Sequence, residues 1–432
     1  MKEIETIKNL IANYHQSVKK NLIERDYKLP LTLNKIITVI GPRRSGKTAL
    51  LQFAAQQIAE EGIKRTQIIY INFEDERLSL SAKDLDKILQ AYLELYPNQD
   101  LSTCYFFFDE IQNVDGWEKF VRRVYDTVSS HVFLTGSNAK LLSSEIATEL
   151  RGRTYTIELL PLSFKEYLRF KKIDATKYDS NTEAKINAAF IQFMKEGGFP
   201  EIALLPSEFH KNILQDYYHV MMYRDMIERY GFGSVPVLKY FLKRMYESIT
   251  TPFSVNKVYN ELKSQGYKLS KNTLYEYLDA SIAIFLCSSV LKMSHSIVKQ
   301  ELSEKKYYAI DTGLLNALTF AFKDDWGAML ENTVHLELRK RGFKSYYYKG
   351  NKECDFVVED SSGGLLPMQV CYSMSNLDTR KREFAGLLEA CKALNVKHGV
   401  VITLSDKEKI MVDNVEIELI PAARYFSGDL NY

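Results

Sequence analysis

Cysteine is scarce in this chain of 432 residues and is not arranged for a disulfide framework or a metal site. The five cysteines are Cys104, Cys287, Cys354, Cys371 and Cys391. No two of them have CxxC spacing, and no histidine stands near one at the spacing of a zinc site. Isolated cysteines of this kind are expected to be buried free thiols in a protein of a reducing compartment.

Long apolar runs and a strong excess of one charge are also absent. The longest nearly uncharged apolar run, Ala280 to Leu291, is too short to cross a bilayer of about 30 Å. The amphipathic N-terminus lacks the apolar segment of a signal peptide. A net charge of +2 gives no whole-chain argument for nucleic acid or an anionic membrane. We therefore expect a soluble, cytoplasmic protein with no membrane partner.

Length and composition predict several globular domains. Hydrophobic residues make up 46% of the chain and charged residues 26%, which are ordinary globular values and exclude a disordered or fibrous class. Since a domain usually takes about 100–200 residues, the length predicts about two to four domains.

A glycine-rich loop follows an apolar strand near the N-terminus. Residues 36–40, Ile-Ile-Thr-Val-Ile, predict a buried parallel strand, and residues 48–62 predict a helix with a glycine stop. Between them, every fixed position of G-x-x-x-x-G-K-[ST] is matched by Gly41, Pro42, Arg43, Arg44, Ser45, Gly46, Lys47 and Thr48. A strand before this motif and a helix after it is the context that a phosphate-binding P-loop requires.

The residue types of this loop suit phosphate and Mg²⁺. Gly41 and Gly46 allow a turn whose N–H groups point toward phosphate oxygens at a helix N-terminus. Lys47 can reach the β- and γ-phosphates, and the Thr48 hydroxyl can ligate Mg²⁺. The loop therefore predicts a site for a nucleoside triphosphate.

Two carboxylates follow a second apolar strand. Residues 105–108, Tyr-Phe-Phe-Phe, lead directly into Asp109 and Glu110. Because ligands of such sheets bind at the carboxyl ends of the strands, Asp109 is expected to hold Mg²⁺ and Glu110 to activate the attacking water. A solvated strand end is the alternative for an acidic pair alone, and the P-loop favours the catalytic interpretation.

A third strand, residues 131–135, ends just before Ser137 and Asn138. Either side chain can contact the γ-phosphate as a sensor, or can cap a helix starting at Ala139. The guanine-reading Asn-Lys-x-Asp is absent from the chain, which favours ATP as the nucleotide.

The motifs together resemble a prokaryotic AAA+-like P-loop ATPase family whose members carry an uncharacterised C-terminal region. Besides the P-loop, the resemblance lies in Phe107–Gln112, Leu134–Asn138, Leu150–Arg153, Leu160–Phe164 and Gly197–Glu201, and it covers nearly the whole chain. It implies an α/β fold with a AAA+ doubly wound parallel sheet in residues 1–160 and a helical lid in 161–232. It further implies a winged helix in 233–312 and a restriction-endonuclease-like domain in 313–432.

The resemblance also implies an arginine that senses the γ-phosphate, within the chain or across a subunit interface. Arg153 is the favoured residue in the segment from Arg151, and a surface charge is the alternative. A homo-oligomer is therefore a candidate assembly.

Residues 231–300 have the capping and turn residues of a helix-turn-helix and a local positive charge. Three helices are expected at 237–249, 254–265 and 270–284, followed by two wing strands at 285–291 and 307–310. The stretch holds nine Lys or Arg and four Asp or Glu, which is the balance of a DNA-binding surface. Two of those acids lie on the third helix and oppose phosphate contact. DNA and a protein partner are both candidate partners.

The last hundred or so residues resemble the PD-(D/E)xK nuclease core in part. Glu331 and Asp355 match its first two acidic positions, whereas Gln369 and Cys371 replace the third acid and the lysine. An amide is a poor Mg²⁺ ligand and a thiol supplies no fixed positive charge, so we expect no nuclease activity. Lys349 and Lys352 are candidate substitutes for the missing lysine.

The sequence thus predicts an enzyme that hydrolyses ATP with Mg²⁺ and couples its nucleotide state to C-terminal DNA- or protein-binding domains. The alternatives are a DNA-binding regulatory module with slow or vestigial hydrolysis, and an ATP-coupled nuclease.

Overall fold

The computed structural model describes residues 2–18, 22–139, 148–175, 180–294, 296–319 and 325–427. The chain divides into two compact units, Met1–Leu160 and Pro161–Tyr432, each with its own sheet and hydrophobic core. All five cysteines are buried free thiols, as expected. Within the described residues, no helix has the length and apolar character needed to span a membrane.

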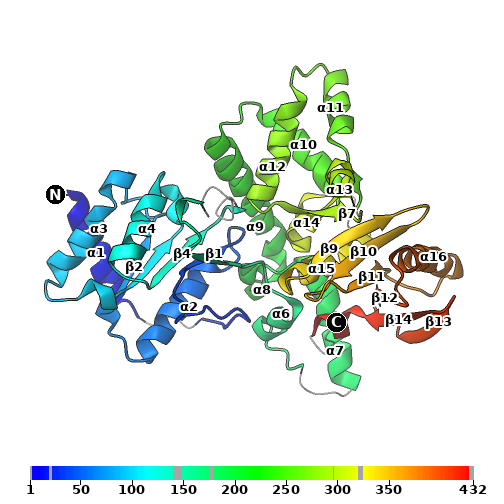
Figure 1. Ribbon diagram of the computed structural model, residues 1–432, viewed down its shortest axis with the longest axis horizontal. Helices are drawn as coiled ribbons and strands as arrows, with labels where there is room; N and C mark the ends of the chain where they lie inside the picture. Colours follow the sequence, from blue (N-terminus) through cyan, green and yellow to red (C-terminus); the bar gives the residue numbers. More distant parts are fainter. Residues whose placement is uncertain are drawn as a thin grey trace. The chain divides into compact units, whose positions relative to one another are not determined.

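A parallel sheet forms the centre of the first unit (Figure 1). In the described residues its strands are β1 (Ile36–Ile40), β2 (Ile68–Asn72), β3 (Tyr105–Asp109), β4 (Val132–Gly136) and β5 (Thr154–Glu158), in the order β2-β3-β4-β1-β5. Every neighbouring pair is parallel, so the carboxyl ends of all these strands lie on one edge. The three strands expected from the sequence are present.

Helices pack on both faces of this sheet. They are α1 (Lys2–Gln16), α2 (Lys47–Glu60), α3 (Asp86–Leu95) and α4 (Trp117–Thr127), with 3₁₀ turns η1 (Arg65–Gln67), η2 (Ala82–Asp84), η3 (Leu101–Thr103) and η4 (Ile111–Asn113). Since successive strand residues point to opposite faces, Phe107 packs in the core with α2 while Phe108 meets Phe120 of α4. The helix expected from Ala139 falls on residues 140–147, outside the described residues.

The second unit begins with helices. These are α6 (Phe164–Phe170), α7 (Ser180–Glu196), α8 (Pro200–Leu204), α9 (Ser207–Val220), the π-helix η6 (Met221–Glu228), α10 (Val235–Glu247), α11 (Val255–Ser264) and α12 (Lys271–Ala283). Later helices are α13 (Ile297–Leu302), α14 (Thr312–Leu318), α15 (Trp326–Lys340), α16 (Leu377–Leu394) and α17 (Ala422–Phe426). The helix-turn-helix pattern read at 237–284 is thus matched by α10, α11 and α12.

A long mixed sheet runs through the second unit. Its described strands are β6 (Pro252–Phe253), β7 (Cys287–Lys292), β8 (Lys305–Ala309), β9 (Lys344–Lys349), β10 (Glu353–Glu359), β11 (Leu365–Val370), β12 (His398–Thr403), β13 (Glu408–Val412) and β14 (Val415–Pro421). Their order is β13-β14-β12-β11-β10-β9-β7-β8-β6. The expected wing strands β7 and β8 pair antiparallel, and β7 also pairs with β9. The sheet therefore crosses the boundary placed at residue 312 from the sequence.

Two helices cover opposite faces of the C-terminal part of this sheet (Figure 1). Leu330 and Val334 of α15 share a core with Phe356 of β10, whereas Leu387 of α16 shares a second core with Cys354 of the same strand. A register shift between Cys354 and Val357 of β10 interrupts its pairing with β9 beside Asp355. That irregularity lies where the acidic residues of this region converge.

Candidate nucleotide-binding site

The P-loop turns tightly between β1 and α2. Gly46 adopts φ 98° and caps α2, which begins at Lys47, and Arg44 adopts φ 65°. At Gly41 an added Cβ would lie 2.1 Å from the carbonyl oxygen of Leu159, so only glycine fits there. The backbone conformation at Gly46 and the close contact at Gly41 thus both require glycine. The loop presents the N-terminus of α2 at the carboxyl edge of the sheet.

Lys47 is buried at the centre of this loop, with 4% of its surface exposed. Its Nζ donates to the carbonyl oxygens of Gly41 (3.2 Å) and Pro42 (3.0 Å) and lies 3.2 Å from Oε1 of Glu110. The lysine of β1–α2 and the carboxylate that follows β3 therefore converge, as the sequence predicts for a P-loop beside an acidic strand end.

Asp109 ends β3 in a buried polar network. The hydroxyl of Tyr70 donates to its Oδ2 at 2.8 Å, that of Thr135 donates to Oδ1 at 2.5 Å, and Thr48 is a further side-chain partner. Burial raises the pKa of Asp109, while the hydrogen bonds from Thr135 and Tyr70 oppose that shift. The same Thr135 hydroxyl accepts from the Glu110 N–H at 2.8 Å. Thr48 and Asp109, the two residues predicted to hold Mg²⁺, are thus brought together.

Glu110 is held in a left-handed backbone conformation with φ 52° and is buried. Burial opposes its ionisation, but the charges of Lys47 and Arg43 and a 2.5 Å hydrogen bond from Gln112 outweigh it and lower the pKa. The amide of Gln112 also lies 3.3 Å from the Ser137 hydroxyl. The environment keeps Glu110 as a carboxylate that can accept a proton.

The remaining predicted residues of the loop and sensor segment are buried or paired. Ser137 and Asn138 are both buried after β4, and Ser137 is linked to Glu110 through Gln112. Arg43 forms a 2.5 Å ion pair with Glu74, which follows β2. The buried Ser45 hydroxyl has no hydrogen-bond partner among the described residues. A free buried hydroxyl in a P-loop is a group that a bound phosphate can satisfy.

Arg153 does not belong to the site of its own chain. Its carbonyl accepts from the N–H of Ile36, so it lies at the amino edge of β1, whereas the P-loop follows Ile40 at the carboxyl edge. A strand of this length separates the two edges by roughly 16 Å at about 3.3 Å per residue. The Arg153 guanidinium is paired with Asp126 at 2.7 Å. The Arg153 side chain therefore lies away from the P-loop of its own chain. A role toward the nucleotide of a neighbouring chain stays a prediction, and a surface charge paired with Asp126 stays the alternative.

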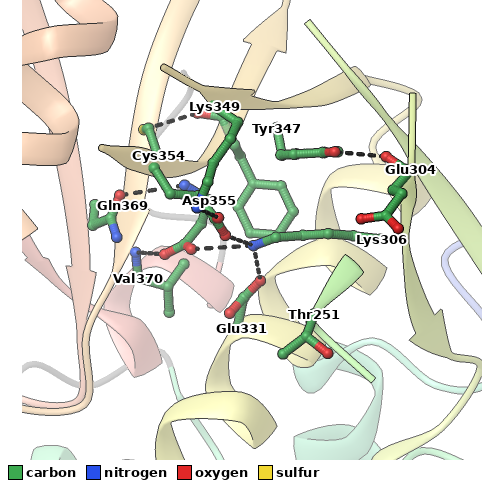
Figure 2. A network of polar contacts seen from close by, with 12 residues as sticks. Thr251, Glu304, Lys306, Glu331, Tyr347, Lys349, Cys354, Asp355, Gln369 and Val370 are labelled. Carbon is green, nitrogen blue, oxygen red and sulfur yellow. Dashed lines mark hydrogen bonds and ion pairs between the residues drawn. The ribbon is translucent and has the colours of Figure 1, made fainter. Parts of the chain in front are cut away.

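A second polar cluster lies in the C-terminal region (Figure 2). Glu331 of α15 and Asp355 of β10, the two matches to the nuclease pattern, lie on either side of one amine, Nζ of Lys306 from β8. Glu353 is the third carboxylate around that amine, at 2.9 Å. The structure therefore brings the two predicted acids together but adds a buried lysine between them.

The replaced nuclease positions are occupied by structural contacts. The Gln369 amide donates to Glu383 at 2.6 Å, and its oxygen accepts from the Asp355 N–H at 3.3 Å. Burial raises the pKa of the Cys371 thiol to about 11. Among the described residues, no group of three His, Cys, Asp or Glu is placed to hold a metal ion.

The two lysines proposed as substitutes lie at the edge of this cluster. Lys349 is paired with Glu353 at 2.6 Å and is about half exposed, and the side chain of Lys352 is exposed. Neither position matches the buried amine of Lys306.

Five residues of these two sites were not identified from the sequence: Tyr70, Gln112, Thr135, Lys306 and Glu353. Gln112 and Thr135 carry a weak signal, because each is a polar residue next to a predicted strand end. Tyr70 lies within an apolar strand, and Lys306 follows another lysine at the start of β8, so neither carries such a signal.

The chain is similar in sequence to known proteins along most of its length. The chain is 37% identical over 426 residues to the uncharacterized protein MJ1544 of Methanocaldococcus jannaschii, which covers 95% of this chain and 92% of that protein. The chain belongs to the same family as this protein. It is also 28% identical over 386 residues to an uncharacterized protein of Haemophilus influenzae, with 88% of this chain and 92% of that protein covered.

Family profiles match three segments of the chain. Residues 33–168 match a AAA domain, so the first unit carries a P-loop ATPase domain, in agreement with its parallel sheet. Residues 187–325 and 326–425 match two domains of unknown function, DUF8612 and DUF4143. The crystal structure of Cdc6p from Pyrobaculum aerophilum aligns at 13% identity over 77% of this chain and 93% of that one, with a TM-score of 0.27 that is too low to carry an argument.

Proposed function

We propose that the protein binds ATP with Mg²⁺ in the P-loop and hydrolyses it, with Glu110 as the general base. The observation that carries this proposal is the meeting of Lys47, Asp109 and Glu110 at the carboxyl edge of one parallel sheet. Lys47 bonds two loop carbonyls that a β- or γ-phosphate would replace as partners. Mg²⁺, held by Thr48 and Asp109, would neutralise charge on the phosphates.

Release of Glu110 from Lys47 is the proposed link between binding and turnover. Phosphate contact would draw the Lys47 amine away, and Glu110 would then be left with Gln112 as its fixed partner. A carboxylate oriented in this way can position water and accept its proton. Ser137, joined to the same amide, is the proposed sensor side chain.

Coupling to the second unit is proposed to start at the end of β5. Leu159 donates its N–H to Ile40 and its carbonyl lies against Gly41, while Arg25 bonds the carbonyls of Ser45 and Leu160 at 2.8 and 2.9 Å. The last residues of the first unit are therefore bonded to the P-loop. A shift of the loop on nucleotide binding would act directly on the chain that continues at Pro161.

The test of this function is Mg²⁺-dependent ATP turnover by the whole chain. Lys47→Ala should lose both tight ATP binding and turnover, whereas Lys64→Ala, which removes an exposed lysine of the same unit, should match the wild type. Equal turnover by Lys47→Ala and the wild type would place the activity elsewhere.

DNA binding is a second candidate function, favoured by the turn between α11 and α12. Residues 263–272 contain three lysines and no acidic residue, and Lys263, Lys268 and Lys271 are exposed. Arg244 of α10 is instead neutralised by Glu247 and Glu261. We propose a winged helix whose turn contacts the phosphate backbone.

A salt titration tests that surface. Changing the three lysines to alanine should weaken binding to duplex DNA at low salt and reduce the slope of log affinity against log salt by about two to three. Lys239→Ala and Lys243→Ala, on α10, form the control. An unchanged slope would exclude this turn as the contact.

We further propose that residues 313–432 have a restriction-endonuclease-like fold without nuclease activity. The support is the arrangement of α15, β9, β10 and β11, together with Gln369 and Cys371 at the positions of the missing catalytic residues.

A further inference from the structure

Lys306 occupies the centre of the carboxylate cluster in the second unit. Its Nζ lies 2.9 Å from Glu353, 3.2 Å from Glu331 and 3.5 Å from Asp355, and 1% of the residue's surface is exposed. Figure 2 shows the amine pointing between Glu331 and Asp355, with Gln369 on the other side of Asp355. A buried ammonium surrounded on several sides by carboxylate oxygens has the position that a bound cation would take.

The lysine and the carboxylates come from different parts of the chain. Lys306 lies on β8, inside the segment matched as DUF8612, whereas Glu331, Glu353 and Asp355 lie on α15 and β10 in the DUF4143 segment. The β7–β9 pairing that joins the two parts of the sheet brings β8 to this place. The amine is thus supplied to the cluster by the preceding segment.

We propose that Lys306 is an internal cation that takes the place of a divalent metal ion in this cluster. The native protein therefore holds no metal there, and the contact joins the two C-terminal segments. These residues are remote in sequence from the P-loop, and their role does not depend on ATP hydrolysis.

A second lysine adds to the positive charge of the cluster. Lys349 pairs with Glu353 at 2.6 Å. Lys306 and Lys349 thus place two positive charges among the three carboxylates, and a divalent cation entering the cluster would be repelled by them.

A tyrosine hydroxyl and a backbone N–H also donate to the carboxylates of the cluster. The Tyr308 hydroxyl donates to Glu331 at 2.9 Å, and the Val370 N–H donates to Asp355 at 3.0 Å. With these donors and Lys306 in place, a metal ion would have to displace an ammonium to gain its ligands. Removing the amine alone should therefore create a metal site from groups that are already assembled.

Mn²⁺ binding by the whole, nucleotide-free protein tests this proposal through electron paramagnetic resonance. Lys306→Met keeps the length of the side chain and removes its charge, so it should bind Mn²⁺ about tenfold or more tightly than the wild type. Lys349→Met removes a lysine from the same cluster at a side chain that is 48% exposed, and should not gain this site. The double variant Lys306→Met with Asp355→Asn should lose it again.

A second comparison uses the wild type and does not require Lys306→Met to fold. Asp355→Asn alone should leave the number of Mn²⁺ ions bound by the otherwise native protein unchanged, because the native cluster holds none. A lower number for Asp355→Asn would show that the native cluster binds metal and would overturn the proposal. Failure of a folded Lys306→Met protein to gain Mn²⁺ would overturn it as well, as would Mn²⁺-dependent plasmid cleavage lost in Asp355→Asn.

Discussion

At the scale of single residues, Glu110 combines burial with a set of neighbours that favours its charged form. Lys47 lies 3.2 Å away, and the Gln112 amide donates to its other oxygen. A buried carboxylate without such partners would take up a proton at neutral pH and could not act as a base. The charge state of Glu110 therefore depends on Lys47 of the P-loop and on Gln112, two residues after it.

Gln112 provides a prediction on this point. Gln112→Ala removes the donor that holds Glu110, so the pKa of Glu110 should rise and kcat should fall by about tenfold. The acid limb of the pH–rate profile should move to higher pH, because the base is then protonated at higher pH. Steady-state ATP turnover between pH 5 and 9 measures both effects.

The control for Gln112 is Gln90→Ala, which removes an exposed glutamine of the same unit that bonds Glu94. An acid limb that stays in place while kcat falls would indicate a purely structural contribution of Gln112.

Glu331 carries a pH-dependent stability. Burial and Asp355 raise its pKa from 4.5 to about 8, against the opposing effects of Lys306 and Tyr308. The native state therefore keeps a proton that the unfolded chain loses, and this stability is complete below about pH 4.5 and is lost as pH rises toward 8. Glu331→Gln should reduce the change in unfolding free energy over this pH range by on the order of a few kcal/mol.

Guanidinium unfolding of the wild type and Glu331→Gln at pH 5 and pH 8 measures the difference. Equal losses of unfolding free energy in both proteins between these pH values would contradict the assignment to Glu331.

At the scale of elements, the sequence was informative wherever a local pattern decides the structure. The strand at 36–40, the P-loop and α2 follow one another along the chain, so β-branched residues, two glycines and a helix pattern were sufficient to predict them. The strands β3 and β4 were predicted by the same reasoning, and so were α10, α11 and α12. In each case the deciding residues are neighbours in sequence.

Contacts between distant elements were not predictable in this way. Tyr70 reaches Asp109 because β2 and β3 are neighbours in the sheet. The order of the strands cannot be predicted from the sequence of any single strand. Lys306 of β8 reaches Asp355 because β7, the neighbour of β8, also pairs with β9. This short pairing connects two segments that were assigned to separate domains from the sequence. The position of Arg153 at the amino edge of β5 likewise required the register of β1 and β5.

Asp311 links the turn at Gly197 and Gly198 to the start of α14. Its buried carboxylate accepts from Leu314 at 2.8 Å, which caps α14, and from Gly198 at 2.6 Å. Asp311→Ala removes both acceptors and should lower the unfolding free energy by about 1–3 kcal/mol. Hydrogen exchange of residues 311–319 measures the loss of protection.

The matched change is Asp325→Ala, which removes the exposed cap of α15 and should cost about 0.5–1 kcal/mol. Equal protection of α14 in Asp311→Ala and the wild type would contradict the bridging role of Asp311.

At the scale of the whole molecule, the predicted role of Arg153 on the nucleotide requires an assembly. Arg153 lies at the edge of the sheet opposite its own P-loop, so it can serve a nucleotide only in another copy of the chain. We predict that Arg153→Ala lowers ATP turnover by roughly 10²-fold or more. Mixing it with Lys47→Ala should restore turnover in part, since the second variant supplies the arginine to the intact P-loop of the first.

Turnover by the mixture therefore measures the arrangement in trans. A mixture no more active than the sum of its two components would exclude a shared site between copies.

ATP hydrolysis with Glu110 as the base is the central claim, and one pair of measurements on Glu110→Gln tests it most directly. The amide keeps the shape of the side chain but cannot accept a proton, so ATP binding should stay within a few-fold of the wild type. Mg²⁺-dependent turnover should fall by about 10²–10⁴-fold. Turnover equal to that of the wild type would contradict the account.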